Sequence, residues 1–457
     1  MSDHKVEIVV VGAGIVGISC AYYLSLHQPT ARISIVDQHS PMSLTSANSG
    51  ENYRNWWPHP IMTAFTDYSI DLLEEIARKH ENRINMTRRG YALATRQSQP
   101  DGLLAELQRG YGSEGTRRIR IHDKASSSAY QPAVSEDWRD APDGVDVIQN
   151  PDLIRQHFPT FDPEIATILH IRRAGDISSQ QLGSLMLEHI RARGGSVIQA
   201  QVVEISARDG DFALKLVDRD GEQSLRSEIL VNAAGPYVAK VAEMLGETVP
   251  VENVFHQKIA FADALGAIDR RMPFSIDLDS QLIDWTPHER EVLEEDPASA
   301  WLGSSMPGGI HCRPEGGDHG TWIKLGWAYN RTPSEPEEKP PIDSNFPDIV
   351  LRGASRLNPR LKQYYGRLPR HITHYGGYYT MTKENWPLIG PMRAKGAFIA
   401  GALSGFGTMA ACAAGALCAG WVHSNGIPSF ARSLAMSRYD DEHFVSRLLG
   451  ETGTGVL

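Results

Sequence analysis

Residues 6–24 read VEIVVVGAGIVGISCAYYL, and this stretch decides the fold. The run 8–11 is apolar and β-branched, which is typical of a central parallel strand buried on both faces. Three glycines follow at Gly12, Gly14 and Gly17, ahead of an apolar helix. They allow a tight turn, a close approach of the backbone to a pyrophosphate, and close packing of the helix on the strand. The stretch therefore predicts an α/β fold that begins with a phosphate-binding turn.

A second strand is expected over 31–36; it ends at Asp37, and Gln38 comes next in the chain. The Asp37 carboxylate can accept hydrogen bonds from ribose hydroxyls. Strand, glycines, helix, second strand and acid occur in order within about thirty residues, which predicts a dinucleotide site. The alternative is a tight structural turn, which would not require the acid.

Two later segments decide between NAD and FAD, because both cofactors use this unit. Residues 227–237 read SEILVNAAGPY, a strand that runs into a turn of small residues. Residues 396–407 read GAFIAGALSGFG, a strand that leads through a glycine loop to the start of a helix. Such a helix start carries about half a positive charge and can stabilise the anionic edge of a reduced flavin. A site assembled from both ends of the chain suits a large, extended cofactor and favours FAD.

The stretch 398–422 contains no charged residue and is long enough on count to cross a bilayer. Ala and Gly dominate it, however, and Gly401, Gly405 and Gly407 crowd its first part. We therefore expect a strand over 397–400, a glycine loop and a buried helix rather than a membrane span. The first residues are polar and charged and do not resemble a signal peptide.

The composition limits the classes of partner. Among 457 residues there are 45 Lys+Arg and 55 Asp+Glu, a net charge of −10, which argues against a nucleic-acid surface. Cys20, Cys312, Cys412 and Cys418 show no metal-type spacing and no disulfide framework, so a reducing compartment is expected. We expect a cytoplasmic protein of two or three domains, without a metal site, that is a monomer or a small homo-oligomer.

Five motifs in order carry a family resemblance. The chain resembles the D-amino-acid oxidase superfamily of FAD-dependent oxidoreductases and is most similar to its glycine oxidase and monomeric sarcosine oxidase branch. The motifs are VVVGAGIVGISCAYYL at the N-terminus, TSANSGENYR at 45–54, GDISSQQLGSLMLEHIRARGGSVIQAQVVEI at 175–205, ILVNAAGPYVAKVAEMLG at 229–246, and YYTMTKENWPLIGP with the following AGALSGFG near the C-terminus.

The resemblance implies an α/β protein, α+β overall, in which a Rossmann-like FAD-binding domain is interleaved with a substrate domain built on an antiparallel sheet. The implied pieces are 1–88, 170–246 and 366–435 for the FAD domain, 89–169 and 247–365 for the substrate domain, and 436–457 for a C-terminal tail.

Two segments need a separate interpretation. The polar stretch 117–141 is longer than the family pattern requires, and it is either a lid over the active-site mouth or a solvated loop. Residues 331–341 read RTPSEPEEKPP, which excludes a helix or a central strand and predicts a surface connection.

The resemblance also assigns cofactor contacts residue by residue, although a plain turn is the alternative for each small residue. The implied FAD-binding residues are Gly12, Gly14, Gly17, Asp37, Gln38, Ser46, Asn48, Ser49, Gly50, Val203, Ala234, Gly235, Ser404, Gly405, Gly407, Thr408 and Met409.

Covalent attachment of the flavin needs a nucleophilic Cys or His at family positions. The cysteine position of sarcosine oxidases corresponds to about Gly377 here, and no histidine lies between Thr45 and Gly50. We therefore predict that FAD is bound non-covalently.

Lys324 is the sharpest catalytic candidate. It stands in TWIKLGWAY, an alternating strand pattern that matches the KxG of the sarcosine-oxidase-like branch. In that branch the lysine approaches the flavin and promotes its reaction with oxygen, because a fixed ammonium stabilises the superoxide formed first. The alternative is a lysine that extends from a sheet edge into solvent.

The usual substrate anchors of the family are mostly replaced. Tyr379 stands at the place of the arginine that clamps the substrate carboxylate, Met409 at that of an assisting lysine, and Ala328 at that of a histidine. Arg54, in ENYRNWW, remains as a cation near the expected flavin face, or forms a structural ion pair with Glu51. The predicted catalytic residues are thus Lys324, Arg54 and Tyr379.

Aromatic residues are plentiful where the substrate pocket is expected, and they favour an amine with a bulky or hydrophobic substituent. Core packing is the alternative for each. The predicted substrate contacts are Arg54, Trp56, Tyr378, Tyr379 and Trp386, and Trp57 belongs to the same aromatic group.

The sequence predicts an FAD-dependent oxidase of a secondary amine or D-amino acid type of substrate. It would oxidise a C–N bond to an imine and reduce molecular oxygen to hydrogen peroxide. A dehydrogenase that passes electrons to a quinone or a protein is one alternative. A non-enzymatic flavoprotein with an assembly or binding role is another.

Overall fold

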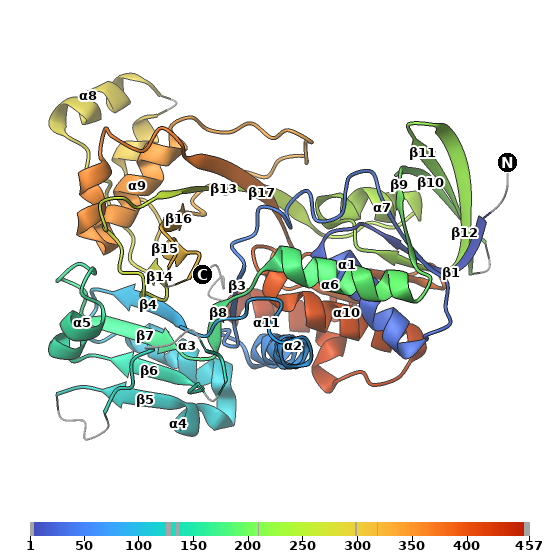
Figure 1. Ribbon diagram of the computed structural model, residues 1–457, viewed down its shortest axis with the longest axis horizontal. Helices are drawn as coiled ribbons and strands as arrows, with labels where there is room; N and C mark the ends of the chain where they lie inside the picture. The colour runs from blue at the N-terminus through green and yellow to red at the C-terminus, as the bar shows by residue number, and fades with distance from the viewer. Residues whose placement is uncertain are drawn as a thin grey trace.

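The chain has two lobes, and each is built around its own sheet (Figure 1). The structure is a computed structural model that describes residues 4–124, 129–133, 137–139, 141–208, 210–297, 299–317 and 319–451. Fold-class expectations of a mixed α/β protein with two interleaved parts are confirmed, because both sheets draw strands from several distant segments.

The first sheet has a parallel centre in the order β19-β12-β1-β2-β9. The hairpin β10–β11 extends it antiparallel from β12, and β18 pairs antiparallel with β19. Residues 8–11 of β1 are buried, as expected for a strand covered on both faces. Its strands are β1 (His4–Val11), β2 (Ile33–Asp37), β9 (Ser196–Gln199), β10 (Gln201–Arg208), β11 (Asp211–Asp218), β12 (Gly221–Asn232), β18 (Leu388–Pro391) and β19 (Ala397–Gly401).

Helices cover both faces of this sheet. One face packs against α1 (Ile15–His27) and α10 (Gly407–His423), on which α6 (Ser179–Ala192) and α2 (Pro60–Lys79) pack in turn. The other face packs against the short α7 (Val238–Met244) and the inner side of the β10–β11 hairpin.

The Ala- and Gly-rich stretch 398–422 forms β19, a loop and α10, which confirms the predicted strand, glycine loop and buried helix. A Cβ at Gly415 would lie 2.6 Å from the backbone carbon of Ser19, so α10 approaches α1 more closely than larger residues would allow. Among the residues that the structure describes, no helix is both long and apolar enough to cross a membrane.

The second sheet runs in the order β17-β13-β16-β15-β14-β4-β7-β6-β5. The predicted antiparallel sheet is mixed, because β4–β14 and β5–β6 are parallel pairs. Its strands are β4 (Tyr91–Thr95), β5 (Ile119–His122), β6 (Val145–Ile148), β7 (Thr167–Ile171), β13 (Glu252–Ala262), β14 (Phe274–Asp277), β15 (Ile310–Glu315), β16 (Trp322–Gly326) and β17 (Thr373–Met381).

The two faces of the second sheet differ in chemistry. Ile259, Phe261, Ile323 and Leu325 point into an apolar cluster that includes residues of α9 (Phe346–Leu357). Because side chains alternate along a strand, the intervening positions face the other way, toward the first lobe. This opposite face carries charged and aromatic residues, and it forms one wall of the site described below.

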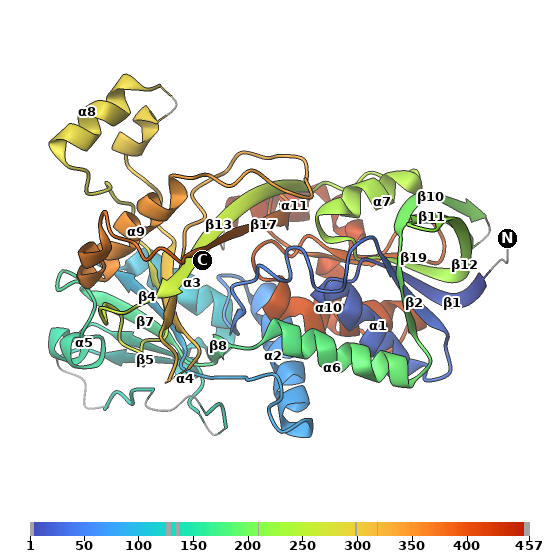
Figure 2. The ribbon, with the colours of Figure 1, turned by 45° about the horizontal axis from the view of Figure 1, so that its top comes forward.

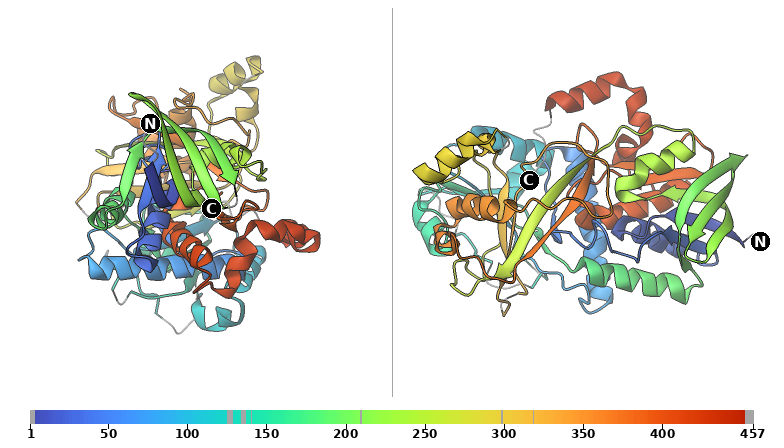
Figure 3. Two further views of the ribbon diagram at one scale, coloured as in Figure 1. Left: turned by 90° about the vertical axis from the view of Figure 1, so that its right-hand side faces the viewer. Right: turned by 90° about the horizontal axis from the view of Figure 1, so that it is seen from above.

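Long strands β13 and β17 run side by side from the second lobe toward the first (Figure 3). The predicted boundary assigned 366–435 to the cofactor domain, whereas β17 pairs with β13 in the second sheet. A separate short pair, β3 (Asn52–Arg54) with β8 (Ala174–Asp176), lies between the lobes (Figure 1).

The remaining helices lie on the outside of the two lobes, and α8 projects from the second lobe (Figure 2). They are α3 (Asp101–Tyr111), α4 (Gly115–Arg118), α5 (Pro151–His157), α8 (Pro287–Glu295) and α11 (Glu442–Glu451), with short 3₁₀ turns at Gly112–Glu114, Gly235–Tyr237, Ala300–Gly303, Pro359–Tyr364, Ser429–Leu434 and Met436–Asp440.

Segment 117–141 is only partly described, and residues 125–128, 134–136 and 140 lie outside the described residues. Its described part contributes the edge strand β5, and the Tyr130 hydroxyl lies 2.8 Å from His170 Nδ1. Residues 331–341 are mostly exposed and form the predicted surface connection.

Candidate active site

The turn after β1 requires its glycines. Gly12 has a φ of +111°, and a Cβ there would lie 2.7 Å from the carbonyl carbon of Ala233. A Cβ at Gly17 would lie 3.0 Å from the carbonyl carbon of Gly12, so the first turn of α1 packs directly on the preceding loop. The predicted strand, turn and helix are therefore packed as a phosphate-binding unit requires.

Asp37 is fixed at the carboxyl end of β2. Its Oδ2 accepts a hydrogen bond from the Ala13 N–H at 2.7 Å, and its Oδ1 accepts one from the His39 N–H at 2.9 Å. A carboxylate has further lone pairs, so these two bonds leave capacity for hydroxyl donors. Asp37 lines two adjoining cavities of about 1020 and 710 Å³.

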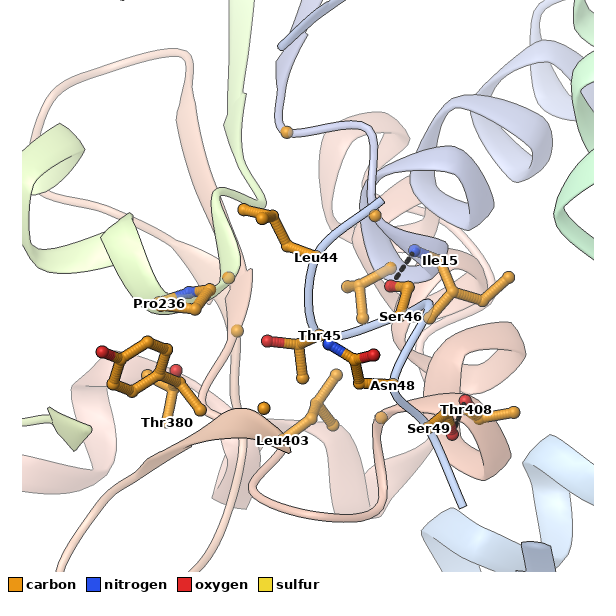
Figure 4. Close-up of a pocket in the computed structure, with 18 of the residues that line it drawn as sticks. Ile15, Leu44, Thr45, Ser46, Asn48, Ser49, Pro236, Thr380, Leu403 and Thr408 are labelled. Carbon is orange, nitrogen blue, oxygen red and sulfur yellow. Dashed lines mark hydrogen bonds between the residues drawn. The ribbon is translucent and has the colours of Figure 1, made fainter. Parts of the chain in front are cut away.

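We call the larger of these the cofactor cavity and the smaller the ribose-side cavity; they share Gly12, Asp37, Leu44 and Ala234. Figure 4 shows the cofactor cavity, with the loop that carries Leu44 to Ser49 as part of its lining. Predicted cofactor residues that line one or both cavities are Gly12, Gly14, Asp37, Gln38, Ser46, Asn48, Ser49, Gly50, Ala234, Gly235, Ser404, Gly405, Gly407 and Thr408.

Three predicted cofactor residues lie elsewhere. Gly17 packs behind the turn, and Met409 lines a third cavity described below. Val203 is 38% exposed at an irregularity in the β10–β11 pairing, and Val202 lines the ribose-side cavity instead.

Two helices begin at the cofactor cavity, and in neither does the N-cap residue's own side chain cap the helix. At the start of α1, the Ile15 N–H donates to Ser46 Oγ at 2.9 Å (Figure 4). At the start of α10, Thr408 Oγ1 lies 2.7 Å from Ser49 Oγ. The remaining N–H groups and the dipole of a helix start favour anions. One can serve a pyrophosphate and the other the anionic edge of a flavin, so the residues present fit FAD.

A third cavity, of about 860 Å³, opens beside the cofactor cavity, and we call it the substrate-side cavity. Its aromatic lining comes from both lobes. The two cavities share the six residues Ser49, Gly50, Lys258, Tyr379, Ser404 and Gly405, and the aromatic lining consists of Trp57, Tyr91, Phe274, Tyr379 and Phe406.

Arg54 reaches the substrate-side cavity from β3. Its guanidinium carbon lies 5.2 Å from the Trp57 ring centroid and 5.8 Å from that of Tyr91, and its Nε donates to the Trp56 carbonyl at 3.2 Å. Burial lowers the pKa of Arg54 to about 10, so the side chain stays charged at neutral pH. Glu51, considered as its ion-pair partner, instead accepts hydrogen bonds from the Ser179 N–H and Oγ at 2.9 and 2.8 Å.

Lys324 lies on the face of the second sheet that is directed toward the first lobe. It is not among the residues that line these three cavities. Its Nζ lies 2.7 Å from Glu315 Oε1, and Arg313 Nη2 lies 2.6 Å from the same oxygen. Burial opposes ionisation of Glu315, but Arg313 and Lys324 outweigh it and lower its pKa. Burial lowers the pKa of Lys324 as well, with Arg313 adding to the effect.

Lys258, on β13, is a residue that the sequence reasoning missed. It is only 4% exposed, and it lines both the cofactor cavity and the substrate-side cavity. Its Nζ lies 5.5 Å from the centroid of the Tyr379 ring. The pattern that could have revealed it is the strand VFHQKIAFA, in which a lysine directly precedes the apolar run IAFA.

Two histidines flank Lys258 and are uncharged at working pH. Burial, reinforced by the charge of Lys258, lowers the pKa of His256 and that of His311 to about 3 each. His311 Nδ1 donates to the Gly309 carbonyl at 3.2 Å, and the His256 ring packs edge-on against Tyr379.

The predicted aromatic residues separate into two groups. Tyr379 lines the cofactor and substrate-side cavities, and Tyr378 lines the cofactor cavity while its hydroxyl donates to the Glu335 carbonyl at 3.2 Å. Trp56 and Trp386 are fully buried in apolar clusters and line none of the three cavities. Trp57 takes the place in the cavity wall that was expected of Trp56.

Backbone strain concentrates in the linings of the cofactor and substrate-side cavities. Five residues other than glycine that line the cofactor or substrate-side cavity have φ between 45° and 64°, a conformation that is rare outside glycine. They are Met42, Glu51, Asn385, Ala402 and Ser404.

Comparisons with known proteins agree with this geometry. A family profile described as FAD dependent oxidoreductase (DAO) matches residues 7–421. The fold is similar to that of glycine oxidase from Geobacillus kaustophilus, with 14% identity, a TM-score of 0.70, and coverage of 95% of this chain and 99% of that one. It is also similar to that of L-proline dehydrogenase from P. horikoshii, with 16% identity, a TM-score of 0.70, and coverage of 96% of this chain and 99% of that one. For iminodiacetate oxidase from Chelativorans sp. BNC1 the identity is 16%, the TM-score is 0.64, and the coverage is 94% of this chain and 98% of that one. No curated protein sequence matches this chain.

Proposed function

Because the chain belongs to the DAO family of FAD-dependent oxidoreductases, we propose that it is an oxidase of an amine or amino acid. The observation that carries the proposal is the shared wall of the cofactor and substrate-side cavities. Six residues, among them Lys258 and Tyr379, line both. A substrate in the second cavity therefore lies directly against a flavin in the first.

FAD would lie along the cofactor and ribose-side cavities without a covalent bond. Asp37 would accept from the ribose hydroxyls, the start of α1 would meet the pyrophosphate, and the start of α10 would meet the flavin's pyrimidine edge. No cysteine lines these cavities among the residues that the structure describes, and no histidine stands between Thr45 and Gly50, which supports non-covalent binding. Precipitation with acid should release the yellow colour into solution; a yellow pellet would contradict this assignment.

When bound, FAD would supply an acceptor for the hydride equivalent of the C–H bond next to the substrate nitrogen, and would pass two electrons to oxygen to give peroxide. The chain's residues orient the substrate and control its protonation. Trp57, Tyr91 and Phe406 offer apolar faces that exclude water from the reacting carbon. Arg54 and Lys258 disfavour a further positive charge, so they lower the amine pKa and favour the neutral, reactive amine.

Because the substrate amine is held neutral, no side chain has to remove a proton from it as a strong general base, and water hydrolyses the product imine. His256 and His311 agree with this, because burial lowers the pKa of each to about 3 and so makes each a weak base.

The oxygen side of the reaction remains a prediction based on Lys324. Its engagement with Glu315 is the specific observation that favours the second candidate, a dehydrogenase with a quinone or protein acceptor. The L-proline dehydrogenase named above has a similar fold, so the fold itself does not separate the two activities.

The experiment is a turnover screen of the FAD-loaded enzyme against secondary amines, D-amino acids and L-amino acids, with peroxide and dye reduction read in parallel. The oxidase proposal predicts peroxide from at least one class. Dye reduction without peroxide would favour the dehydrogenase, and no reaction with any class would contradict both.

A further inference from the structure

Lys258 is a buried cation without a counter-ion. Its residue is 4% exposed, and within the described part of the chain its Nζ has no carboxylate oxygen within 4.0 Å and no hydrogen bond. Its one direct partner there is the face of the Tyr379 ring, 5.5 Å away. Burying an ammonium without an anion is unfavourable, so such a group points to a ligand that completes it.

The neighbouring acids are already engaged. Glu315 holds Lys324 and Arg313, and Asp176 lies 2.9 Å from the other nitrogen of Arg313. Glu51 accepts both hydrogen bonds offered by Ser179. None of these carboxylates forms an ion pair with Lys258. Each has other partners, so the ion pairs and hydrogen bonds of these acids are complete without the Lys258 charge.

The strand register fixes where Lys258 can reach. Lys258 stands opposite Gly326 of β16, which has no side chain. A Cβ at Gly326 would lie 2.8 Å from His311 Cε1, so the His311 ring fills the space beside the lysine. His311 and Tyr379 thus bound the lysine on two sides, and the side that remains accessible is the junction of the two cavities.

We propose that Lys258 binds the carboxylate of the substrate and so selects amino acids over neutral or purely cationic amines. The proposal rests on the oxidase or dehydrogenase function above and names its substrate class. The anchor comes from β13, and not from Tyr379 or Met409, where related enzymes carry their cationic anchors. Arg54, in the same cavity, adds positive potential that favours the same anion.

The test separates charge from shape with two probes that cannot be oxidised as amines. Benzoate and benzamide have nearly the same shape and suit the aromatic lining, but only benzoate is an anion. Each is titrated into the FAD-loaded enzyme, and binding is followed by the change in the flavin's visible spectrum. Wild-type enzyme should bind benzoate at least about 10-fold more tightly than benzamide, because a charge-assisted hydrogen bond is formed only by the carboxylate.

Lys258→Met should remove this preference while leaving benzamide binding within about 2-fold of wild type. The matched control is Lys324→Met, a lysine on the same sheet face that is paired with Glu315 and lines neither cavity; it should keep the preference. Benzoate should also raise the melting temperature of wild type but not of Lys258→Met. If Lys258→Met does not load FAD, Lys258→Gln takes its place. The comparison of benzoate with benzamide in the wild-type enzyme tests the inference independently of either variant.

Equal binding of benzoate and benzamide by wild type, or no measurable benzoate binding, would overturn the inference even if amines reduce the flavin. A preference that survives in Lys258→Met would overturn it as well. If Lys258→Met instead slows flavin reoxidation by oxygen and keeps the preference, the lysine serves the oxygen reaction. The proposed function fails separately, when no amine or amino acid reduces the flavin although the benzoate preference is present.

Discussion

Gly405→Ala tests the contact between the two lobes at the shared wall of the cavities. Gly405 has no positive φ, so the backbone itself accepts an alanine. The added Cβ would lie 2.6 Å from Cζ of Tyr379 and 2.9 Å from its hydroxyl oxygen. These distances are well below van der Waals contact, so the Tyr379 ring or the loop must move.

The cost can be estimated from the surroundings of the ring. Tyr379 packs 4.4 Å from the His256 ring and faces Lys258, so it has little room to move on the side of the second sheet. Overpacking of this kind costs about 1–3 kcal/mol. Gly405→Ala should therefore lower the stability of the holoenzyme by about that amount and weaken FAD binding.

The assay is a double-mutant cycle with thermal or urea unfolding of the FAD-loaded protein. Removing the ring with Tyr379→Ala should relieve the clash, so that Gly405→Ala costs less than about 0.5 kcal/mol in that background. Tyr379→Phe is the matched control: it keeps the ring and should keep the clash. If Gly405→Ala costs the same with and without the ring, the placement of Tyr379 against the α10 loop is refuted.

Three further predictions address other parts of the structure. Arg438→Met should lower stability by about 3–5 kcal/mol in urea unfolding, because it leaves Glu384 charged where both side chains are 1% exposed; an effect under 1 kcal/mol would contradict this ion pair. His170, His256 and His311 each have a pKa lowered to about 3 from 6.5. As pH falls from 6.5 toward 3 the unfolded chain therefore takes up protons that the folded chain refuses, and stability should fall by about 1.4 kcal/mol per pH unit for each histidine. His311→Gln should reduce the dependence of stability on pH by about 1.4 kcal/mol per pH unit, measured by urea unfolding at several pH values. An unchanged dependence would argue against a neutral, buried His311. Lys324→Met should slow reoxidation of the flavin by oxygen far more than its reduction by substrate in stopped-flow measurements, and equal slowing of both steps would remove Lys324 from the oxygen reaction.

The cofactor half was predictable from sequence because its signals are local. Gly12, Gly14 and Asp37 are spaced by the geometry of one strand–turn–helix unit, and that unit is read directly from the chain. The family profile confirms the resemblance that these and the later motifs carried. The Ala- and Gly-rich C-terminal stretch was interpreted correctly for the same reason, since its glycines mark a loop before a helix.

The substrate half was harder because its residues meet across strands far apart in sequence. Lys258 stands opposite Tyr375 in the β13–β17 pairing, yet its Nζ reaches Tyr379, which stands opposite Val254, and no local pattern specifies that contact. Lys324 was chosen from a short motif, yet its immediate partner Glu315 comes from β15. Trp56 and Trp57 are adjacent, so only the direction of the chain after β3 decides which of them lines the cavity.

The proposed function requires that a substrate amine lies against the flavin and gives up two electrons to it, which then pass to oxygen. Its most direct test is an anaerobic titration of the FAD-loaded enzyme with an amine or amino acid found active in the screen, followed by admission of air. The flavin's visible absorbance should be lost without oxygen and should return in air, with one hydrogen peroxide formed per flavin reoxidised. A flavin that stays oxidised with every amine and amino acid tested, or that is reduced but returns in air without peroxide, would contradict it.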